Sequence, residues 1–554
     1  MRGNGLMKKY LVLVLAMLMV LSFALSACVP KAPGETPGEA TPALGAEPKI
    51  LRTNNAFEPG SLDPALAQGT HDSWVLDHTF EGLTKKDVDG KIVMGMAKEY
   101  KLADDDVTYT FILRDDIKWS NGDPVTAYDF EFAWKRALDK DLASDYAYQL
   151  YYLKGGEAYN TGTGSVDDVG VKAIDEKTLE VVLESPTAYF LELTSFYTYY
   201  PVNKKVVEAN PDWAKNADTH VSNGPFKMTG WEHNATITLA KNDNYYNSSA
   251  VKLDGIEFTI LNDENTAWQK YLGGEYDFLT PLPQAVVAQL KNEGNPELVI
   301  GGELSVYYYN LYNKMEPFNN AKIRKALALT LDRQTICDKI AQGGQLPAEG
   351  VVPFGMLDEN GKEYRDGVGK LVEYNVEEGK RLFAEGLAET GFKVEDFSKF
   401  SILYNTLEAH KIIAQAAQEM WRTNLGIELQ LENVDFQVKL DREKAGDYQI
   451  SRAGWIGDYI DPMTFIDLWV SDGPFNDAKF NNPEYDRLVK EAKATTDQKV
   501  RMENMRKAEK ILMEAMPVVP VYFYTQPYAQ KPYVTGVFKP LNRYPYFIYA
   551  DMNK

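Results

Sequence analysis

The sequence predicts a mixed α/β body divided into several lobes. The chain has 554 residues, which is enough for two to four domains of ordinary size. Segments with the two-residue period of β-strands and segments with the period of amphipathic helices are mixed along its whole length. No internal repeat of about 20–50 residues is evident, which argues against solenoids and propellers.

The strand and helix patterns are spread over the whole chain. Strand patterns occur at 107–113, 179–183, 256–261 and 427–431, and again directly after Pro517. Helical patterns occur at 127–138, 322–340, 411–425 and 499–516. In the first of these helices Phe130, Trp134 and Leu138 share one face, which we expect to be buried. This mixture favours an α/β or α+β architecture.

The amino terminus has the pattern of a secretory signal. Basic residues precede an apolar run at 10–25, which is short for a membrane-spanning helix. The run ends in Leu25-Ser-Ala-Cys28, which resembles the lipobox of bacterial lipoproteins, where the cysteine is diacylated and becomes the first mature residue. An uncleaved anchor with an incidental cysteine is the alternative. We expect a signal peptide at 1–27, a lipidated Cys28, and a Pro- and Gly-rich linker at 28–47 that tethers an extracytoplasmic body to the cell membrane.

Composition limits the partners that the protein can have. The formal net charge is −21 at pH 7, and a surface this acidic repels phosphate backbones, so we expect no nucleic-acid partner. The chain has only two cysteines. If Cys28 is lipidated, Cys337 has no disulfide partner, and we expect a buried, reduced thiol there. Five histidines leave little room for a multi-histidine metal site, so we expect no metal and no other cofactor.

Signatures of catalysis are missing from the sequence. It contains no G-x-S-x-G elbow, no H-E-x-x-H pair and no phosphate-binding loop of the G-x-x-x-x-G-K-[ST] type. His71 and His78 lie about 10 Å apart along a helix, too far for one metal ion to bind both directly. We interpret the helix that carries them as a solvated one. The sequence therefore predicts a protein that is not an enzyme.

Several motifs together resemble one family. They are Ser61-Leu-Asp-Pro64, Phe80-Glu-Gly-Leu83, Thr108–Arg114 with Lys118–Ala127, Ser222-Asn-Gly-Pro-Phe226, Pro317-Phe-Asn319 and Leu331-Asp-Arg333. The chain is similar in these motifs, from about residue 50 to its end, to the substrate-binding lipoproteins of oligopeptide ABC transporters. This is the dipeptide/oligopeptide/nickel solute-binding family, extracellular family 5.

The resemblance implies a three-lobed fold like that of periplasmic binding proteins, of type II and cluster C, with discontinuous domains. The ligand cleft would lie between lobes I and III, which close around the ligand. The expected ranges are 48–80, 204–309 and 526–554 for lobe I, 81–203 for lobe II and 310–525 for lobe III.

A receptor for peptides of varied sequence can rely only on groups that every peptide has. These are backbone N–H and C=O groups, one ammonium, which needs a carboxylate partner once it is buried, and one carboxylate, which needs a cation. The segment 451–459 (SRAGWIGDY) is similar to the family motif R-A-G-W-x-x-D-Y. By this resemblance Asp458 holds the peptide ammonium, Arg452 receives the carboxylate of a short peptide, and His410 serves longer peptides.

The same motif supplies further candidates. The resemblance implies that Gly454 and Ile456 offer backbone groups for strand pairing with the ligand, while Trp455 and Tyr524 line side-chain pockets. Two positions depart from the family pattern. Alanine stands at 341, where relatives can carry a lysine, and Glu443 stands where relatives can carry a second arginine. These departures leave the preferred peptide length open.

The function expected from the sequence is capture of oligopeptides and their delivery to the permease of an ABC transporter, by a protein that is monomeric. Two alternatives stay open. The same fold could bind an oligosaccharide, with Trp455, Trp469 and Tyr459 stacking on sugar rings. A surface hydrolase with paired carboxylates is the other, although no motif supports it. The scarcity of histidines disfavours nickel or haem as cargo.

Overall fold

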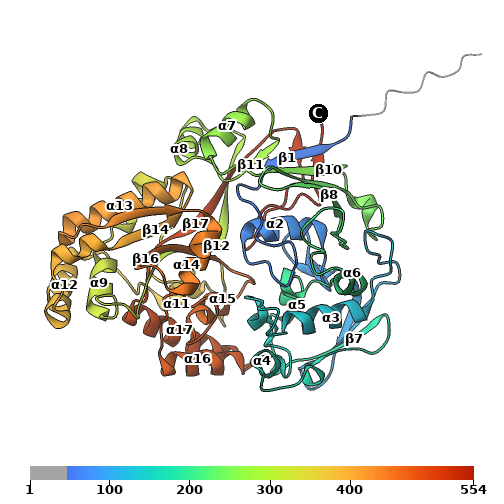
Figure 1. Ribbon diagram of the computed structural model, residues 1–554, viewed down its shortest axis with the longest axis horizontal. Coiled ribbons are helices and arrows are strands. Elements are labelled where there is room, and N and C mark those ends of the chain that lie inside the picture. The colour runs from blue at the N-terminus through green and yellow to red at the C-terminus, as the bar shows by residue number, and fades with distance from the viewer. Residues whose placement is uncertain (1–46) are drawn as a thin grey trace, which may run out of the picture. The chain divides into compact units, whose positions relative to one another are not determined.

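The structure, a computed structural model, describes residues 47–554, and Pro48–Lys554 form one compact unit. The predicted signal peptide at 1–27, the predicted lipidation site Cys28 and all but the last residue of the predicted linker lie outside the described residues. Within the described part, every helix is too short or too polar to cross a lipid bilayer. Figure 1 shows the arrangement of the elements.

A four-stranded sheet contains the first strand of the body. Its order is β1-β10-β9-β8, with β1 parallel to β10 and the other pairs antiparallel. The bounds are β1 Ile50–Asn54, β8 Phe226–Glu232, β9 Thr236–Lys241 and β10 Gly255–Thr259. Helices α2 (Thr70–Thr79), α7 (Glu264–Leu272) and α8 (Gln284–Glu293) follow these strands in the chain. All of these elements lie within the ranges expected for lobe I.

A second four-stranded sheet is built from the next part of the chain. Its order is β4-β5-β7-β6 and all its pairs are antiparallel. The bounds are β4 Ala97–Leu102, β5 Thr108–Leu113, β6 Val171–Ala173 and β7 Thr178–Val182. A short hairpin of β2 (Thr84–Lys86) and β3 (Ile92–Met94) precedes it. The accompanying helices are α3 Ala127–Ala137, α4 Gly156–Asn160, α5 Phe190–Leu193 and α6 Lys204–Ala209.

The largest sheet has seven strands and joins distant parts of the chain. Its order is β11-β17-β12-β16-β14-β15, and β13 pairs with β17. The bounds are β11 Phe278–Leu279, β12 Leu298–Leu311, β13 Leu346–Pro347, β14 Ser401–Asn405, β15 Gln430–Val434, β16 Ile450–Ile456 and β17 Val518–Gln530. The long antiparallel pair β12 and β17 crosses the expected boundaries between lobes I and III, and in Figure 1 it runs through the middle of the body. The exact lobe boundaries stay a prediction.

The later helices lie around the large sheet and are drawn from yellow-green to red-orange in Figure 1, and α9, α13 and α14 contact its strands. Their bounds are α9 Ala321–Leu329, α10 Arg333–Thr335, α11 Tyr364–Val368, α12 Val376–Thr390, α13 Glu408–Leu425, α14 Phe436–Ala445, α15 Met463–Ile466, α16 Pro483–Lys493 and α17 Gln498–Ala515. The chain ends with a small sheet of β18 (Val534–Thr535) and β19 (Asp551–Met552). Cys337 is buried, as predicted.

Most predicted elements are confirmed, but the single helix predicted at 322–340 is wrong. α9 ends at Leu329, and a new turn begins where the side chain of Asp332 accepts a hydrogen bond from the N–H of Thr335. The guanidinium of Arg333 turns back to donate to the carbonyls of Ala328 and Pro520. Asp332 is thus an N-cap in the middle of the amphipathic pattern.

The interpretation of the His71–His78 helix as solvated is also wrong. α2 packs inside the body, and His71 and His78 are 9% and 0% exposed. Nε2 of His78 accepts a hydrogen bond from the N–H of Phe547 at 2.9 Å, so the ring is part of the core. Burial lowers the pKa of both rings to about 4. The carboxy-terminal segment covers the face of α2 that was expected to be exposed to solvent.

Candidate functional site

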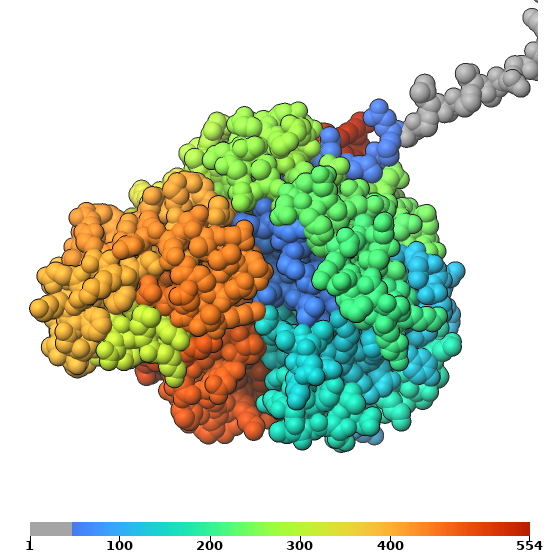
Figure 2. All heavy atoms as spheres, viewed as in Figure 1, coloured from blue at the N-terminus to red at the C-terminus, as the bar shows by residue number. Residues whose placement is uncertain are grey.

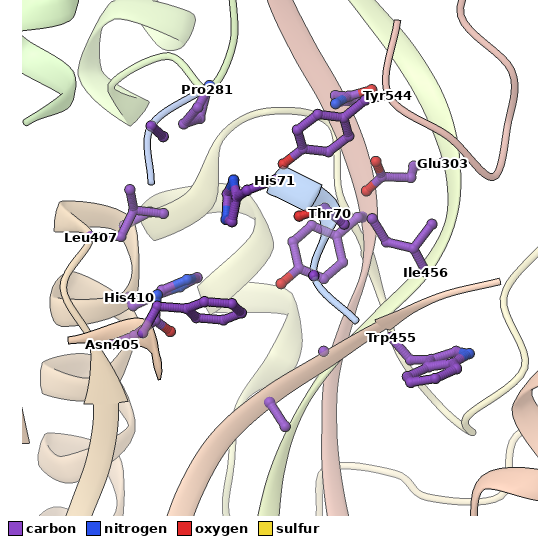
Figure 3. Close-up of a pocket in the computed structure, with 18 of the residues that line it drawn as sticks. Thr70, His71, Pro281, Glu303, Asn405, Leu407, His410, Trp455, Ile456 and Tyr544 are labelled. Carbon is purple, nitrogen blue, oxygen red and sulfur yellow. The ribbon is translucent and has the colours of Figure 1, made fainter. Parts of the chain in front are cut away.

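A cavity of about 340 Å³ lies where early, middle and late parts of the chain meet. Figure 2 shows a groove on one face of the body, with the green surface of the middle of the chain on one side, the orange surface of its later part on the other and early residues, in blue, at its floor. All seven candidate residues predicted for ligand binding line the cavity: His410, Arg452, Gly454, Trp455, Ile456, Asp458 and Tyr524. In Figure 3 Asn405 and His410 lie on one side, Glu303 and Tyr544 on the opposite side, with His71 between them.

Asp458 is a buried carboxylate at the wall of this cavity. It is 4% exposed and forms no ion pair within residues 47–554. Nε2 of Gln149 donates to its Oδ2 at 2.6 Å, and the hydroxyl of Tyr148 donates to the same oxygen at 3.4 Å. Asn542 and Arg543 donate to its backbone carbonyl instead, at 3.0 and 3.2 Å. The side chain is therefore held in place by neutral donors.

The surroundings of Asp458 favour its neutral form. Burial raises the pKa of this carboxyl to about 8, the nearby Arg543 guanidinium opposes the rise, and Asp467 adds to it. A cation brought against this carboxylate would be paired with an otherwise unmatched negative charge. The position has the chemistry of an ammonium site.

Arg452 is the opposite case, a cation without a carboxylate partner in the described part of the chain. Its Nη2 donates to the hydroxyl of Tyr524 at 2.6 Å and its Nη1 donates to Oδ1 of Asn405 at 3.3 Å. The guanidinium lies 4.8 Å from the ring centroid of Tyr307. Its Nε is buried and donates no hydrogen bond within the described residues. Neutral oxygens and an aromatic ring thus orient a fork that can still accept an anion.

His410 lies close enough to Arg452 to be affected by its charge. Burial lowers the pKa of the His410 ring well below its usual value, and the charges of Arg452 and Lys439 lower it further. Its ring packs edge-on against Tyr307, with the centroids 5.7 Å apart. Its Nδ1 is buried and has no hydrogen-bond partner among the described residues. The ring is neutral here and has one nitrogen available for a ligand.

The strand β16 presents its backbone to the cavity. β12 pairs with it from Ile450 to Ile456 on one side, whereas β14 pairs on the other side only with Ile450 and Ser451. The rest of that edge, 452–456, has no strand partner within the described residues. A Cβ on Gly454 would lie 3.0 Å from the hydroxyl of Tyr524, so glycine leaves room for the Arg452–Tyr524 contact. An exposed edge of this kind can bind an extended chain.

Trp455 belongs to an aromatic cluster that the sequence alone did not reveal. Its ring stacks on Tyr146 with centroids 6.2 Å apart and contacts Phe475 at 4.8 Å. Its Nε1 is buried without a partner among the described residues. Trp469 and Tyr459, the other two rings suggested for sugar stacking, are fully buried and lie outside the cavity lining. The aromatic platform expected for a sugar is therefore reduced to Trp455 and its neighbours.

A second aromatic contact closes another part of the wall. Phe436, the first residue of α14, lies with ring centroids 5.8 Å from Phe57 and 5.6 Å from His71. At the other end of α14, Nζ of Lys444 contacts Oδ2 of Asp145 at 2.5 Å and donates to Oε1 of Gln68. One helix of the later chain thus contacts earlier segments at both of its ends. No local motif marks these residues, because they come together only through the fold.

The site and the fold can be compared with known proteins. The model of the bacterial extracellular solute-binding proteins, family 5 (middle), matches residues 91–477. The oligopeptide-binding protein OppA of Bacillus subtilis (strain 168) is 44% identical over 535 residues, which are 95% of this chain and 96% of that protein. The chain belongs to family 5 of the bacterial extracellular solute-binding proteins. The predicted resemblance is confirmed.

Solved structures of family 5 proteins share the fold. Haemophilus influenzae OppA in complex with RPPGFSPFR matches with a TM-score of 0.85 at 34% identity, over 92% of this chain and 99% of that one. The murein tripeptide binding protein MppA of Escherichia coli matches with a TM-score of 0.84 at 30% identity, over 92% and 99%. These matches confirm the periplasmic-binding-protein-like fold, and these relatives are binding proteins rather than enzymes.

A second structure of MppA bears on the conformation. Its unliganded open form matches with a TM-score of only 0.62 at 30% identity, over 92% of this chain and 98% of that one. Identity and coverage are nearly the same in both MppA comparisons, so sequence divergence does not explain the lower score. The arrangement of residues 48–554 differs from that open form.

Proposed function

We propose that this protein captures oligopeptides in the cavity at β16 and delivers them to the permease of an ABC transporter. It acts outside the cytoplasm as a monomer, anchored to the membrane by a lipid on Cys28, and carries out no covalent chemistry. The observation that carries the proposal is that two ionisable groups without an ion-pair partner among the described residues line the cavity: the buried carboxyl of Asp458, just beyond β16, and the partly buried guanidinium of Arg452 on β16.

A peptide carries an ammonium and a carboxylate, which are the partners of opposite charge that Asp458 and Arg452 lack. The ligand ammonium pairs with Asp458 and the ligand carboxylate pairs with the fork of Arg452, so both groups gain a partner of opposite charge. Between them the edge of β16 at 452–456 offers backbone N–H and C=O groups that pair with any peptide backbone. Recognition of this kind is independent of sequence, which suits a receptor for varied peptides.

Unpaired polar atoms around the cavity support a polar ligand. Nε of Arg452, Nδ1 of His410 and Nε1 of Trp455 are all buried without partners within the described residues. A buried polar atom that makes no hydrogen bond costs about 1–3 kcal/mol. The two N–H donors, Nε of Arg452 and Nε1 of Trp455, therefore favour a ligand with acceptors for them. Peptide carbonyl and carboxylate oxygens are such acceptors.

The conformation is consistent with closure around a ligand. The match to the peptide complex of H. influenzae OppA has a higher TM-score than the match to the unliganded open form of MppA. We infer that α14 reaches the early segments, through Phe436 and Lys444, in the closed state. Closure would make the presence of a ligand readable by a transporter.

A thermal-shift screen of residues 48–554 tests the proposal. The protein is partly unfolded and refolded to remove carried-over ligand, then mixed with tri- to pentapeptides or with oligosaccharides. Ligand at about 100 times its Kd adds about 2.7 kcal/mol to the unfolding free energy, so peptides should raise the Tm by a few °C. A shift with oligosaccharides alone would overturn the peptide assignment, and no shift with either would overturn ligand capture.

A further inference from the structure

The helix α14 turns a charged face toward the cavity. Phe436, Lys439, Leu440 and Glu443 all line it, at the spacing of one helix face. The residues between them on the opposite face, such as Arg442, point away: the guanidinium of Arg442 pairs with Glu432 and Asp447. Two ionisable side chains are thus placed where an amphipathic helix normally has apolar residues.

Lys439 and Glu443 form a buried ion pair at this wall. Nζ of Lys439 lies 2.5 Å from Oε2 of Glu443, and the two residues are 3% and 2% exposed. Nδ2 of Asn310 donates weakly to the other carboxylate oxygen, at 3.4 Å. Replacing a buried ion pair by apolar residues often leaves the stability of a protein unchanged or raises it. The stability of the fold therefore does not explain why this pair is present. Its place on the cavity wall points to a role toward the ligand.

A third charged group, Asp477, lies beside the pair. It lines the same cavity, and its Oδ1 is buried and accepts no hydrogen bond within residues 47–554. Burial raises the pKa of this carboxyl to about 7, Glu443 raises it further, and Lys439 opposes the rise. The Lys439–Glu443 pair already satisfies one carboxylate, so these three residues contain one carboxylate more than ammonium groups. The charges of Lys479 and Lys444 also lower the pKa of Asp477, but neither lysine forms an ion pair with it, and Lys444 pairs with Asp145.

Arg452 does not supply the missing cation. Its guanidinium is directed to Tyr524 and Asn405 and is the group that receives the ligand carboxylate in the proposed function. Its charge lowers the pKa of Lys439, as a neighbouring cation does, and it forms no ion pair with Asp477 or Glu443. Once a peptide carboxylate occupies Arg452, the excess carboxylate of the cluster still lacks a partner.

We propose that Lys439, Glu443 and Asp477 form a side-chain subsite for a cationic residue of the bound peptide. A lysine, ornithine or arginine side chain entering between Glu443 and Asp477 would give two cations and two carboxylates, each group with an opposite neighbour. An acidic side chain would add a third negative charge and be rejected. The proposal rests on peptide capture by the cavity and adds a preference among peptides.

The side chain at position 443 affects the net charge of this subsite. An arginine there would make the same wall cationic, together with Lys439. In this chain the residue is Glu443, which pairs with Lys439 one turn earlier on α14.

The test compares tetra-alanine with variants that carry lysine, norleucine or glutamate at the second, third or fourth position, by calorimetric titration of residues 48–554 at pH 8. Norleucine has the length of the lysine stem without its charge, so it controls for apolar contact. We expect lysine to bind at least about tenfold more tightly than norleucine at one position, and glutamate more weakly than norleucine there. Equal affinities for lysine and norleucine at every position would overturn the subsite.

The outcomes separate the subsite from the proposed function. If none of these peptides binds, peptide capture fails and the subsite fails with it. If the norleucine and lysine peptides bind equally well, peptide capture stands and only the subsite is wrong. If glutamate is preferred, Lys439 acts as a second receiver of ligand carboxylates, which also overturns the proposal.

A matched pair of variants assigns the preference to Asp477. Asp477→Asn should remove most of the advantage of lysine over norleucine, while a cooperative thermal unfolding transition shows that the variant is folded. Asp447→Asn is the control, because Asp447 is exposed beside the same helix and pairs with Arg442 outside the cavity. Retention of the full lysine preference in Asp477→Asn would exclude Asp477 from the subsite.

The lysine preference should also depend on pH. Asp477 is faced by Lys439, Glu443 and Lys444 of α14, by Lys479 of its own segment, and by Tyr308 and Tyr448, whose pKa values burial raises. Burial raises the pKa of Asp477 to about 7. The ratio of lysine to norleucine affinity should therefore rise from pH 6 to pH 8. A ratio that stays constant over this range would contradict the assignment.

Discussion

The proposed role of Asp458 places two opposing requirements on it: its carboxylate would bind an ammonium, yet it is held where water is excluded. Its pKa of about 8, raised mainly by burial, means that the free carboxyl is largely protonated at neutral pH. Binding of a peptide ammonium requires the ionised form, so a proton leaves when the peptide binds. Titrations at pH 7 in buffers of different ionisation enthalpy should detect about one proton released. Release of none would contradict the pairing.

The same residue should reduce the stability of the free protein. A group whose pKa is raised from 3.8 to about 8 in the folded state contributes stability that is present at low pH and is lost as the pH rises to 8. Asp458→Asn cannot ionise and avoids this loss. We expect its Tm to exceed that of the unchanged protein by more at pH 8 than at pH 5, by a few °C. A gap that does not change with pH would contradict the burial of an unpaired charge.

Adding a single Cβ atom at Gly454 tests whether the edge of β16 pairs with the backbone of the ligand. A Cβ at this position meets the hydroxyl of Tyr524 at 3.0 Å and Nη2 of Arg452 at 3.4 Å. Gly454→Ala should weaken binding of all peptides by about tenfold, or about 1.4 kcal/mol, whatever their sequence. Gly230→Ala in β8 is the control, since its Cβ meets only Thr238 at an ordinary 3.5 Å. Equal peptide affinity of both variants would exclude the edge of β16 from the site.

Among the elements, α14 has the role that the sequence pattern least suggested. It contacts early segments through Phe436 at one end and Lys444 at the other, and its inner face lines the cavity. The ion pair of Lys444 with Asp145 is partly exposed, and such pairs contribute about 0.2–1 kcal/mol.

Lys444→Ala should therefore weaken peptide binding by about twofold to fivefold at low salt, with a smaller effect at high salt. The control is Arg442→Ala, because the partners of Arg442, Glu432 and Asp447, lie in the same part of the chain and do not connect α14 to the early segments. Calorimetric titration measures both variants. Equal effects of the two substitutions would mean that α14 does not stabilise the closed state.

Periodicity predicted regular elements well where they are long and uninterrupted. The predicted helix at 411–425 corresponds to Glu408–Leu425, and the strand pattern at 107–113 corresponds to Thr108–Leu113. It failed where a side chain competes with the pattern, as Asp332 does by capping a new turn. The strand predicted at 427–431 begins only at Gln430, because Ile427 and Leu429 are buried as part of the connection before it.

The candidate site was predicted through a motif rather than through periodicity. The motif at 452–459 was enough to predict Arg452 and Asp458 as site residues, because all its residues lie on one strand and its continuation. Gln149, Asn405 and Asp477 could not be found in the same way, because each comes from a different part of the chain and no short spacing connects them. The burial of His78 was not predicted because the carboxy-terminal segment that contacts it is more than 400 residues away.

For the whole molecule, capture of a peptide in the cavity requires the body to open and close. The low TM-score against the unliganded open form of MppA supports a closed arrangement here. Small-angle scattering of residues 48–554 should give a smaller radius of gyration with saturating peptide than after the ligand has been removed by partial unfolding and refolding. The same radius in both samples would contradict capture by closure.

Binding of the peptide ammonium by Asp458 can be tested directly by blocking the amino terminus of the ligand. Calorimetric titration at pH 7 compares tri-alanine with its N-acetylated form, on the unchanged protein and on Asp458→Asn. Removing one partner of a buried charge pair costs about 3 kcal/mol or more, so acetylation should weaken binding to the unchanged protein by about 100-fold. The variant should bind both peptides weakly and with nearly equal affinity. If the unchanged protein bound both peptides equally, or if the variant kept the full preference for a free amino terminus, the ammonium would be bound elsewhere and the account would be wrong.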